Sequence, residues 1–240
     1  MGMYLKDNHV YADYLGFDDL SRQQEGLVVS RHSLSEEISY INENQIQLLD
    51  ITLGDPMLFV DKEYSMQAIA KSTNQVADRV FNYDVDISPL RNCSQVKSLA
   101  LCGNIVHSET LQELPLLRCL SIDNTLGKCK IDLSKVQQLH TLLIQKPGRN
   151  VIGFEHIGGL RTLRIWNYTP KSRGLTELLT LENLETLELI QPRIDTLEGI
   201  EQFPVLSRLE VFRSRTLKDT SALKRCTRPI EFVCDSIPAH

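Results

Sequence analysis

Apolar residues recur along the C-terminal two thirds of the chain in a fixed pattern. Each unit has an apolar anchor, followed by apolar residues three and five positions later, and the anchors are 21 to 24 residues apart. The positions six and three residues before each anchor are apolar as well. Across seven units, 34 of these 35 positions are apolar, with Pro229 as the exception. The anchors are Val96, Leu117, Leu139, Leu160, Leu184, Leu206 and Pro229.

The spacings within a unit predict its local structure. Two apolar residues separated by one polar position, such as Leu187 and Leu189, form one face of a short strand. The apolar steps of three that precede each anchor favour 3₁₀ turns or extended chain over an α-helix. One such unit cannot bury its own apolar side, whereas stacked units share a continuous core. The pattern therefore predicts a solenoid of parallel strands with short return segments.

These units resemble the leucine-rich-repeat family, in a short form of about 22 residues. The unit that begins Leu184-Glu-Thr-Leu187-Glu-Leu189 shows the resemblance best, and the pattern covers about residues 87–235. The resemblance implies an α/β fold, a leucine-rich-repeat solenoid (horseshoe or arc) with a parallel concave β-sheet and short 3₁₀ or extended convex segments. The family's usual Asn, eight residues after the anchor, is present only as Asn104.

The repeat pattern weakens toward the N-terminus. We predict an N-terminal cap over residues 1–45, degenerate repeats with an insertion over 46–86, and regular repeats with a short tail over 87–240. Within the cap, Ser33 and Glu36 have the spacing of a capping box that opens a short helix. In the middle segment, anchors at Ile46 and Val76 retain part of the pattern, with a turn at Gly54-Asp55-Pro56 between them.

The residues between the two core positions of each strand must face away from the core. In a repeat solenoid this free face is the large concave surface, and equivalent residues of successive units lie side by side. The middle units place Trp166, Ile190 and Phe212 in one predicted row, with charged residues in the next. The candidate partner-binding residues are Leu143, Gln145, Arg164, Trp166, Tyr168, Glu188, Ile190, Glu210 and Phe212.

Charge and composition narrow the class of partner. The net charge of −5 argues against a nucleic-acid partner, which needs an excess of Lys and Arg. No apolar run is long enough for a membrane span, and no secretion signal opens the chain. The six cysteines form no CxxC pair, which indicates free thiols in a reducing compartment. We therefore expect a cytoplasmic protein with a protein partner and no membrane contact.

Known catalytic motifs are absent from the sequence, so we predict no catalytic residue, no metal ligand and no cofactor. The favoured function is a non-catalytic protein-recognition module, with an inhibitor or immunity-type protein as a sharper version. One alternative is an enzyme or metal site in the N-terminal section that uses Asp84, Asp86 or His32. Another is a structural solenoid that self-associates, as a monomer or weak dimer, through the edge strand around Phe232-Val233-Cys234.

Overall fold

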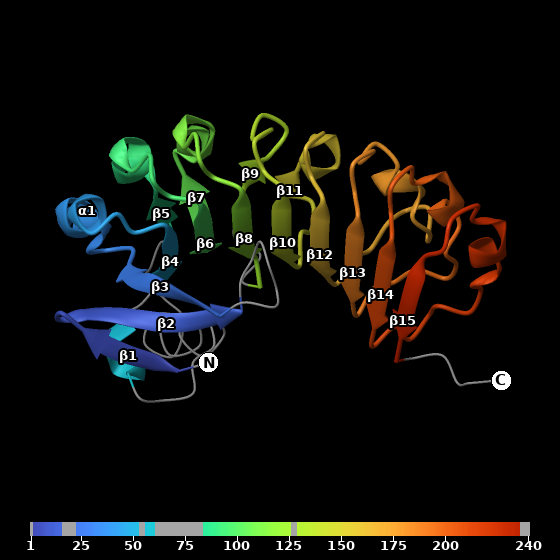
Figure 1. Cartoon of the computed structure of the whole chain (residues 1–240), viewed down its shortest axis with the longest axis horizontal. Coiled ribbons are helices and arrows are strands. Elements are labelled where there is room, and N and C mark those ends of the chain that lie inside the picture. The colour runs from blue at the N-terminus through green and yellow to red at the C-terminus, as the bar shows by residue number, and fades with distance from the viewer. Residues whose placement is uncertain (1, 16–22, 53–55, 61–83, 126–128, 236–240) are drawn as a thin grey trace. The chain divides into compact units, whose positions relative to one another are not determined.

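The computed structural model describes residues 2–15, 23–52, 56–60, 84–125 and 129–235. The chain divides into two compact units, Met1–Ile131 and Asp132–His240. Each contains parallel strands that alternate with short return segments (Figure 1). The repeat anchored at Val76 lies outside the described residues. Of the predicted turn at Gly54-Asp55-Pro56, the described residues include Pro56 alone.

The first unit begins with an antiparallel meander and continues as a parallel sheet. Strands β1 (Met3–Lys6), β2 (His9–Leu15) and β3 (Gln23–Ser30) are antiparallel neighbours. From β3 onward, β4 (Leu48–Thr52), β6 (Ser98–Cys102) and β8 (Cys119–Asp123) add in parallel. A smaller parallel pair joins β5 (Asp84–Asp86) to β7 (Asn104–Val106). The 3₁₀ segments are η1 (Pro56–Phe59), η2 (Ser88–Asn92) and η3 (Ser108–Glu113).

The segment predicted as a cap contains more regular structure than the sequence indicated. Helix α1 (Leu34–Glu43) lies where the helix was predicted, and Ser33 is its N-cap residue. The prediction of a capping box is wrong, because the Ser33 side chain makes no cap hydrogen bond to the helix. Its Oγ instead donates to the carbonyl of Ser30, at 3.3 Å. A shielding role for residues 1–45 stays a prediction.

The second unit is the more regular of the two. Its parallel strands are β10 (Thr141–Gln145), β12 (Thr162–Trp166), β13 (Thr186–Ile190), β14 (Arg208–Phe212) and β15 (Glu231–Cys234). The returns contain η4 (Phe154–His156), η5 (Thr176–Leu178), η6 (Ile200–Gln202) and η7 (Ser221–Arg225). A short ribbon pairs β9 (Ile131–Asp132) with β11 (Val151–Ile152). Strand, turn and 3₁₀ return repeat as the sequence predicted.

The five apolar positions of each repeat form the core. In the six repeats anchored from Val96 to Leu206, every one of these positions is buried. In the last repeat, anchored at Pro229, none of these positions is fully buried. Pro229 is exposed, and the other four are half-buried: Leu223, Cys226, Phe232 and Cys234. The α/β leucine-rich-repeat solenoid is therefore confirmed, and its last repeat is only partly covered.

Candidate functional site

The candidate residues lie on the second unit, on the face of its sheet opposite the core. On strand β12, Leu163 and Ile165 are fully buried. Arg164 and Trp166 alternate with them, so their side chains point away from the core. We name this the open face. The strand register aligns Trp166 with Ile190 and Ile190 with Phe212, and we name these three residues the apolar row. The row predicted from the sequence is thus present in the fold.

A second row runs beside the apolar row. Arg164 aligns with Glu188, and Glu188 with Glu210; these three are the charged row. Leu143 and Gln145 of β10 extend the two rows by one strand. Adjacent strands lie about 4.8 Å apart, so neighbours within a row are within side-chain contact distance. One continuous surface therefore carries eight of the nine candidate residues.

The apolar row is neither fully covered nor fully open. Trp166, Ile190 and Phe212 are each half-buried. The Arg164 guanidinium carbon lies 5.7 Å from the centre of the Trp166 ring, in the position of a cation–π contact. Large apolar side chains that stay in partial contact with water, beside an arginine, have the composition of a protein-binding hot spot.

Ion pairs hold the charged row in place. Arg164 donates through Nε to a Glu188 carboxylate oxygen, and Arg208 Nε donates to Glu210 at 2.7 Å. Glu188 itself is buried, with an exposed fraction of 8%. Burial raises the pKa of Glu188 above its ordinary value, the charge of Glu210 adds to this rise, and Arg164 opposes it. The charged row is therefore fixed in geometry before any partner arrives.

The prediction that Tyr168 widens this surface is wrong. Asn167 follows β12 with a φ of 58°, which ends the strand's alternation and turns the chain. Tyr168 is consequently buried, with an exposed fraction of 5%, and burial raises the pKa of its phenol strongly. Its hydroxyl has no hydrogen-bond partner among the described residues. Tyr168 belongs to the interior of the unit.

The alternative site residues of the N-terminal section are used in local structure. Asp84 and Asp86 lie in the short strand β5, where Asp84 accepts a hydrogen bond from the Asn104 amide at 2.7 Å and Asp86 accepts one from the Ser88 backbone N–H at 2.8 Å. His32 accepts a hydrogen bond from Arg31 Nε at 3.2 Å. Among the described residues, no group of three or more His, Cys, Asp or Glu side chains is arranged to hold a metal ion.

Sequence reasoning missed a groove at the carboxyl ends of β12, β13 and β14. The groove has a volume of about 800 Å³, and we name it the arginine groove. Its lining consists of Asn167, Arg173, Gln191, Pro192, Arg193, Arg213, Ser214, Arg215 and Thr216. Comparing the ninth position after the anchors Leu184 and Leu206 could have found Arg193 and Arg215, which are equivalent residues of adjacent repeats.

The stacked strand-and-return units define a leucine-rich-repeat fold. No family model and no curated protein matches the sequence. Among solved structures, the chain is similar to internalin C2 of Listeria monocytogenes, with 18% identity, 87% of this chain and 76% of that chain covered, and a TM-score of 0.49. It is also similar to an internalin (inlF) of Listeria monocytogenes, with 14% identity, 83% and 57% covered, and a TM-score of 0.40. None of the described helices has the length and apolar character that crossing a membrane requires.

Proposed function

We propose that this chain is a non-catalytic recognition module that binds a partner protein through the open face of its second unit. The apolar row carries the proposal. Solvent contact at Trp166, Ile190 and Phe212 forgoes burial worth about 25 cal/mol per Å² of apolar surface. Contiguous apolar surface of this kind, bordered by fixed charges, favours a protein ligand. We also propose that the repeats are of the short type, since their spacing is 21 to 24 residues.

The test is a comparison of tagged variants in affinity capture followed by quantitative binding to the captured protein. Trp166→Ala/Phe212→Ala should weaken binding by more than about 2 kcal/mol. The matched control is Ile152→Ala/Val205→Ala, which removes two exposed apolar side chains that lie outside the open face. Normal binding by the first variant would refute the proposal, as would its unfolding, because that would make these rings part of the core.

An inhibitor or immunity-type role is the sharper form of this proposal. In that form the captured partner is an enzyme or toxin, and its activity falls when the open face binds. The same two variants test it, since only Trp166→Ala/Phe212→Ala should restore the partner's activity. A partner without any activity that this chain suppresses would leave a binding module and rule out the inhibitor.

The last repeat favours self-association as a second candidate. Strand β15 is the terminal strand of the sheet order, and Phe232, Val233 and Cys234 along it are half-buried. A partly covered strand edge is a template for pairing with a second copy. Sedimentation across a concentration series should show a weak dimer that Val233→Lys abolishes. A wild-type protein that stays monomeric throughout the series would exclude this role.

We further propose a reducing, cytoplasmic location. All six cysteines are free thiols in the structure, and four of them, Cys93, Cys102, Cys119 and Cys129, are buried. Free thiols in this number favour a compartment that keeps cysteines reduced. Fractionation of cells that produce the protein would test the location directly.

A further inference from the structure

The arginine groove differs in charge from the rest of the second unit. Its lining includes four arginines and no Asp or Glu. Elsewhere in this unit four arginines pair with carboxylates: Arg161 with Glu185, Arg164 with Glu188, Arg208 with Glu210 and Glu231, and Arg225 with Glu198 and Glu201. Two carboxylates lie beside the lining: Asp195 pairs with Arg173, and Asp235 accepts a hydrogen bond from the Arg213 backbone N–H at 2.7 Å. Four arginine cations therefore outnumber the neighbouring acids, which gives the groove the chemistry of an anion site.

One of the four arginines is fixed and three are available. Asp195 holds Arg173 through two hydrogen bonds, from Nε at 3.0 Å and from Nη2 at 2.6 Å. Arg193, Arg213 and Arg215 are exposed, and their guanidinium groups form no ion pair among the described residues. Arg193 and Arg215 occupy equivalent positions of adjacent repeats and line the same groove, so their like charges repel. A bound anion would relieve that repulsion.

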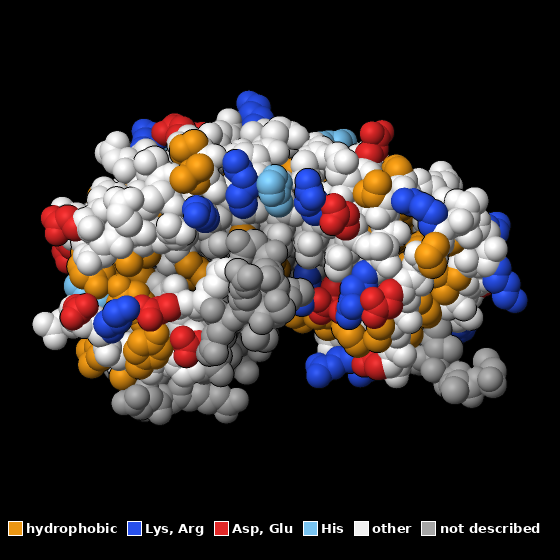
Figure 2. Space-filling model, in the orientation of Figure 1, with side chains coloured by type: hydrophobic (Ala, Val, Ile, Leu, Met, Phe, Trp, Pro, Cys, Tyr) orange, Lys and Arg blue, Asp and Glu red, His pale blue; other side chains and the backbone are white. Residues whose placement is uncertain are grey.

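The groove begins where the apolar row ends. Asn167, Gln191 and Arg213 directly follow Trp166, Ile190 and Phe212, and all three have positive φ, at 58°, 53° and 54°. The backbone N–H of Asn167 donates to the Ile190 carbonyl, and that of Gln191 donates to the Phe212 carbonyl, both at 2.8 Å. Row and groove are therefore adjoining parts of one surface. In Figure 2, Lys and Arg side chains gather at the lower edge of this unit, where the strands end in Figure 1.

We infer that the arginine groove binds the carboxylate or phosphate groups of an acidic segment of the partner protein. This inference rests on the proposed function and adds the partner's chemistry: an apolar anchor for the row, followed by an anionic stretch for the groove. A volume of about 800 Å³ suits several residues of peptide better than one small ion. A nucleic acid fits less well, because Glu188 and Glu210 lie beside the row and the whole chain carries a net charge of −5.

The probes are four fluorescein-labelled ligands, measured by fluorescence anisotropy with the full chain. They are an oligoglutamate peptide of about ten residues, an oligoglutamine peptide of the same length, a phosphoserine peptide of the same net charge, and a single-stranded oligonucleotide of that charge. The test variant is Arg193→Gln/Arg213→Gln/Arg215→Gln. Gln is compatible with the backbone at position 213, because Gln191 occupies the equivalent position with the same sign of φ.

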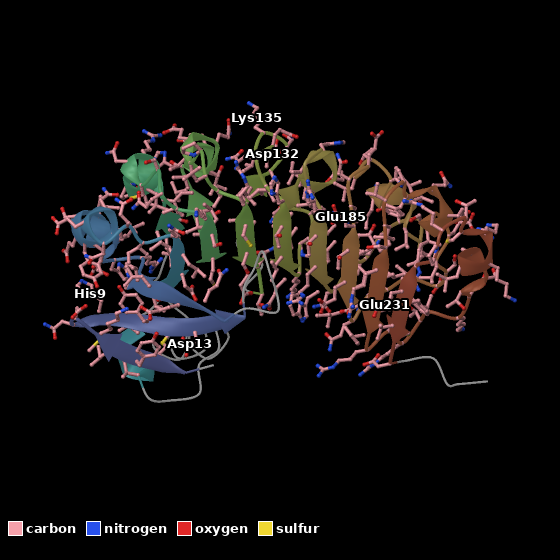
Figure 3. All side chains as sticks on the ribbon, in the orientation of Figure 1. His9, Asp13, Asp132, Lys135, Glu185 and Glu231 are labelled. Carbon is pink, nitrogen blue, oxygen red and sulfur yellow. The ribbon has the colours of Figure 1, made fainter. Side chains whose placement is uncertain are left out.

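The matched control removes three positive charges elsewhere in the same unit. It is Lys135→Gln/Arg161→Gln/Lys224→Gln; Lys135 projects from a return segment at the top of Figure 3, away from the strand ends. Oligoglutamate should bind more weakly to the groove variant by about tenfold or more, while the control should change binding by less than about twofold. Wild-type binding should weaken as salt rises.

Each of the other ligands and variants tests one part of the inference. Equal binding of oligoglutamine, or equal loss in the two triple variants, would overturn the inference. Tighter binding of the oligonucleotide than of either anionic peptide would also overturn it. Preference for phosphoserine over glutamate would support the groove and identify phosphate as the source of the anion. Trp166→Ala/Phe212→Ala should keep its oligoglutamate affinity, so a failure of the apolar row and a failure of the groove give different results.

Discussion

Arg164 covers one face of Trp166, with its guanidinium carbon 5.7 Å from the ring centre. Its Nε also donates to Glu188 on the next strand, so the arginine is held from two sides. The side chain is only 23% exposed. This arrangement keeps water from part of an aromatic ring that would otherwise be open, and it connects the charged row to the apolar row.

Arg164→Ala should expose the Trp166 ring to water. Trp166 is the single tryptophan of the chain, so tryptophan fluorescence reports on the surroundings of this one ring. We expect the emission maximum to shift to longer wavelength and acrylamide quenching to increase, while far-ultraviolet circular dichroism stays unchanged. Arg161→Ala is the control, because Arg161 forms an exposed ion pair with Glu185 and belongs to neither row. An unchanged emission maximum in Arg164→Ala would show that the arginine does not cover the ring in solution.

Leu163→Ala and Leu187→Ala should each lower the free energy of unfolding by about 2–5 kcal/mol. Both side chains are fully buried and lie opposite each other on β12 and β13, so truncation leaves a cavity between stacked repeats. Urea unfolding monitored by circular dichroism gives the values. A cost below about half a kcal/mol in both variants would contradict the core assignment.

The solenoid and the open-face rows could be predicted because both depend on the alternation of side chains along each strand. The same alternation recurs in every repeat of the sequence, which makes it easy to recognise. Leu163, Ile165, Leu187 and Leu189 mark the inner face, and the rows follow from them. The prediction for Tyr168 fails because it assumes that alternation continues beyond Trp166, whereas the positive φ of Asn167 ends the alternation there. The arginine groove was missed for a related reason: loop residues carry no period-two pattern, so their meeting place depends on backbone turns.

Tyr168→Phe should leave the free energy of unfolding unchanged or raise it, by up to about 1 kcal/mol. The Tyr168 hydroxyl is buried and has no hydrogen-bond partner among the described residues, so its removal relieves a desolvation cost and loses no bond. Tyr168→Ala, by contrast, should cost about 3–5 kcal/mol, because it empties a ring-sized volume of the core. Thermal and urea unfolding of both variants provide the comparison. A marked loss in Tyr168→Phe would indicate that a bound water or another group satisfies the hydroxyl.

Thiol reactivity should divide the six cysteines into two groups. Burial raises the pKa of Cys129 to about 12 and raises that of Cys102 further, and only the thiolate reacts rapidly with a disulfide reagent. In the native protein we expect Cys226 and Cys234, which are half-buried, to react first, and the four buried thiols to react only on unfolding. Titration with Ellman's reagent, with and without denaturant, measures this. A native protein with fewer than six titratable thiols after denaturation would indicate a disulfide.

Glu188→Gln should make stability less dependent on pH. Burial raises the folded-state pKa of Glu188, so the folded protein retains this proton to higher pH than the unfolded chain, whose Glu pKa is about 4.3. The stability that protonated Glu188 contributes is therefore fully present below the unfolded pKa and is lost as pH rises through the folded pKa. Gln cannot titrate, so the free energy of unfolding of the variant minus that of the wild type should increase as pH rises through this window.

Urea unfolding at a series of pH values measures this difference in the free energy of unfolding. The control for the change in net charge is Glu185→Gln, which removes an exposed carboxylate paired with Arg161. A difference that falls with rising pH would mean that the ion pair with Arg164, rather than burial, governs the ionisation of Glu188.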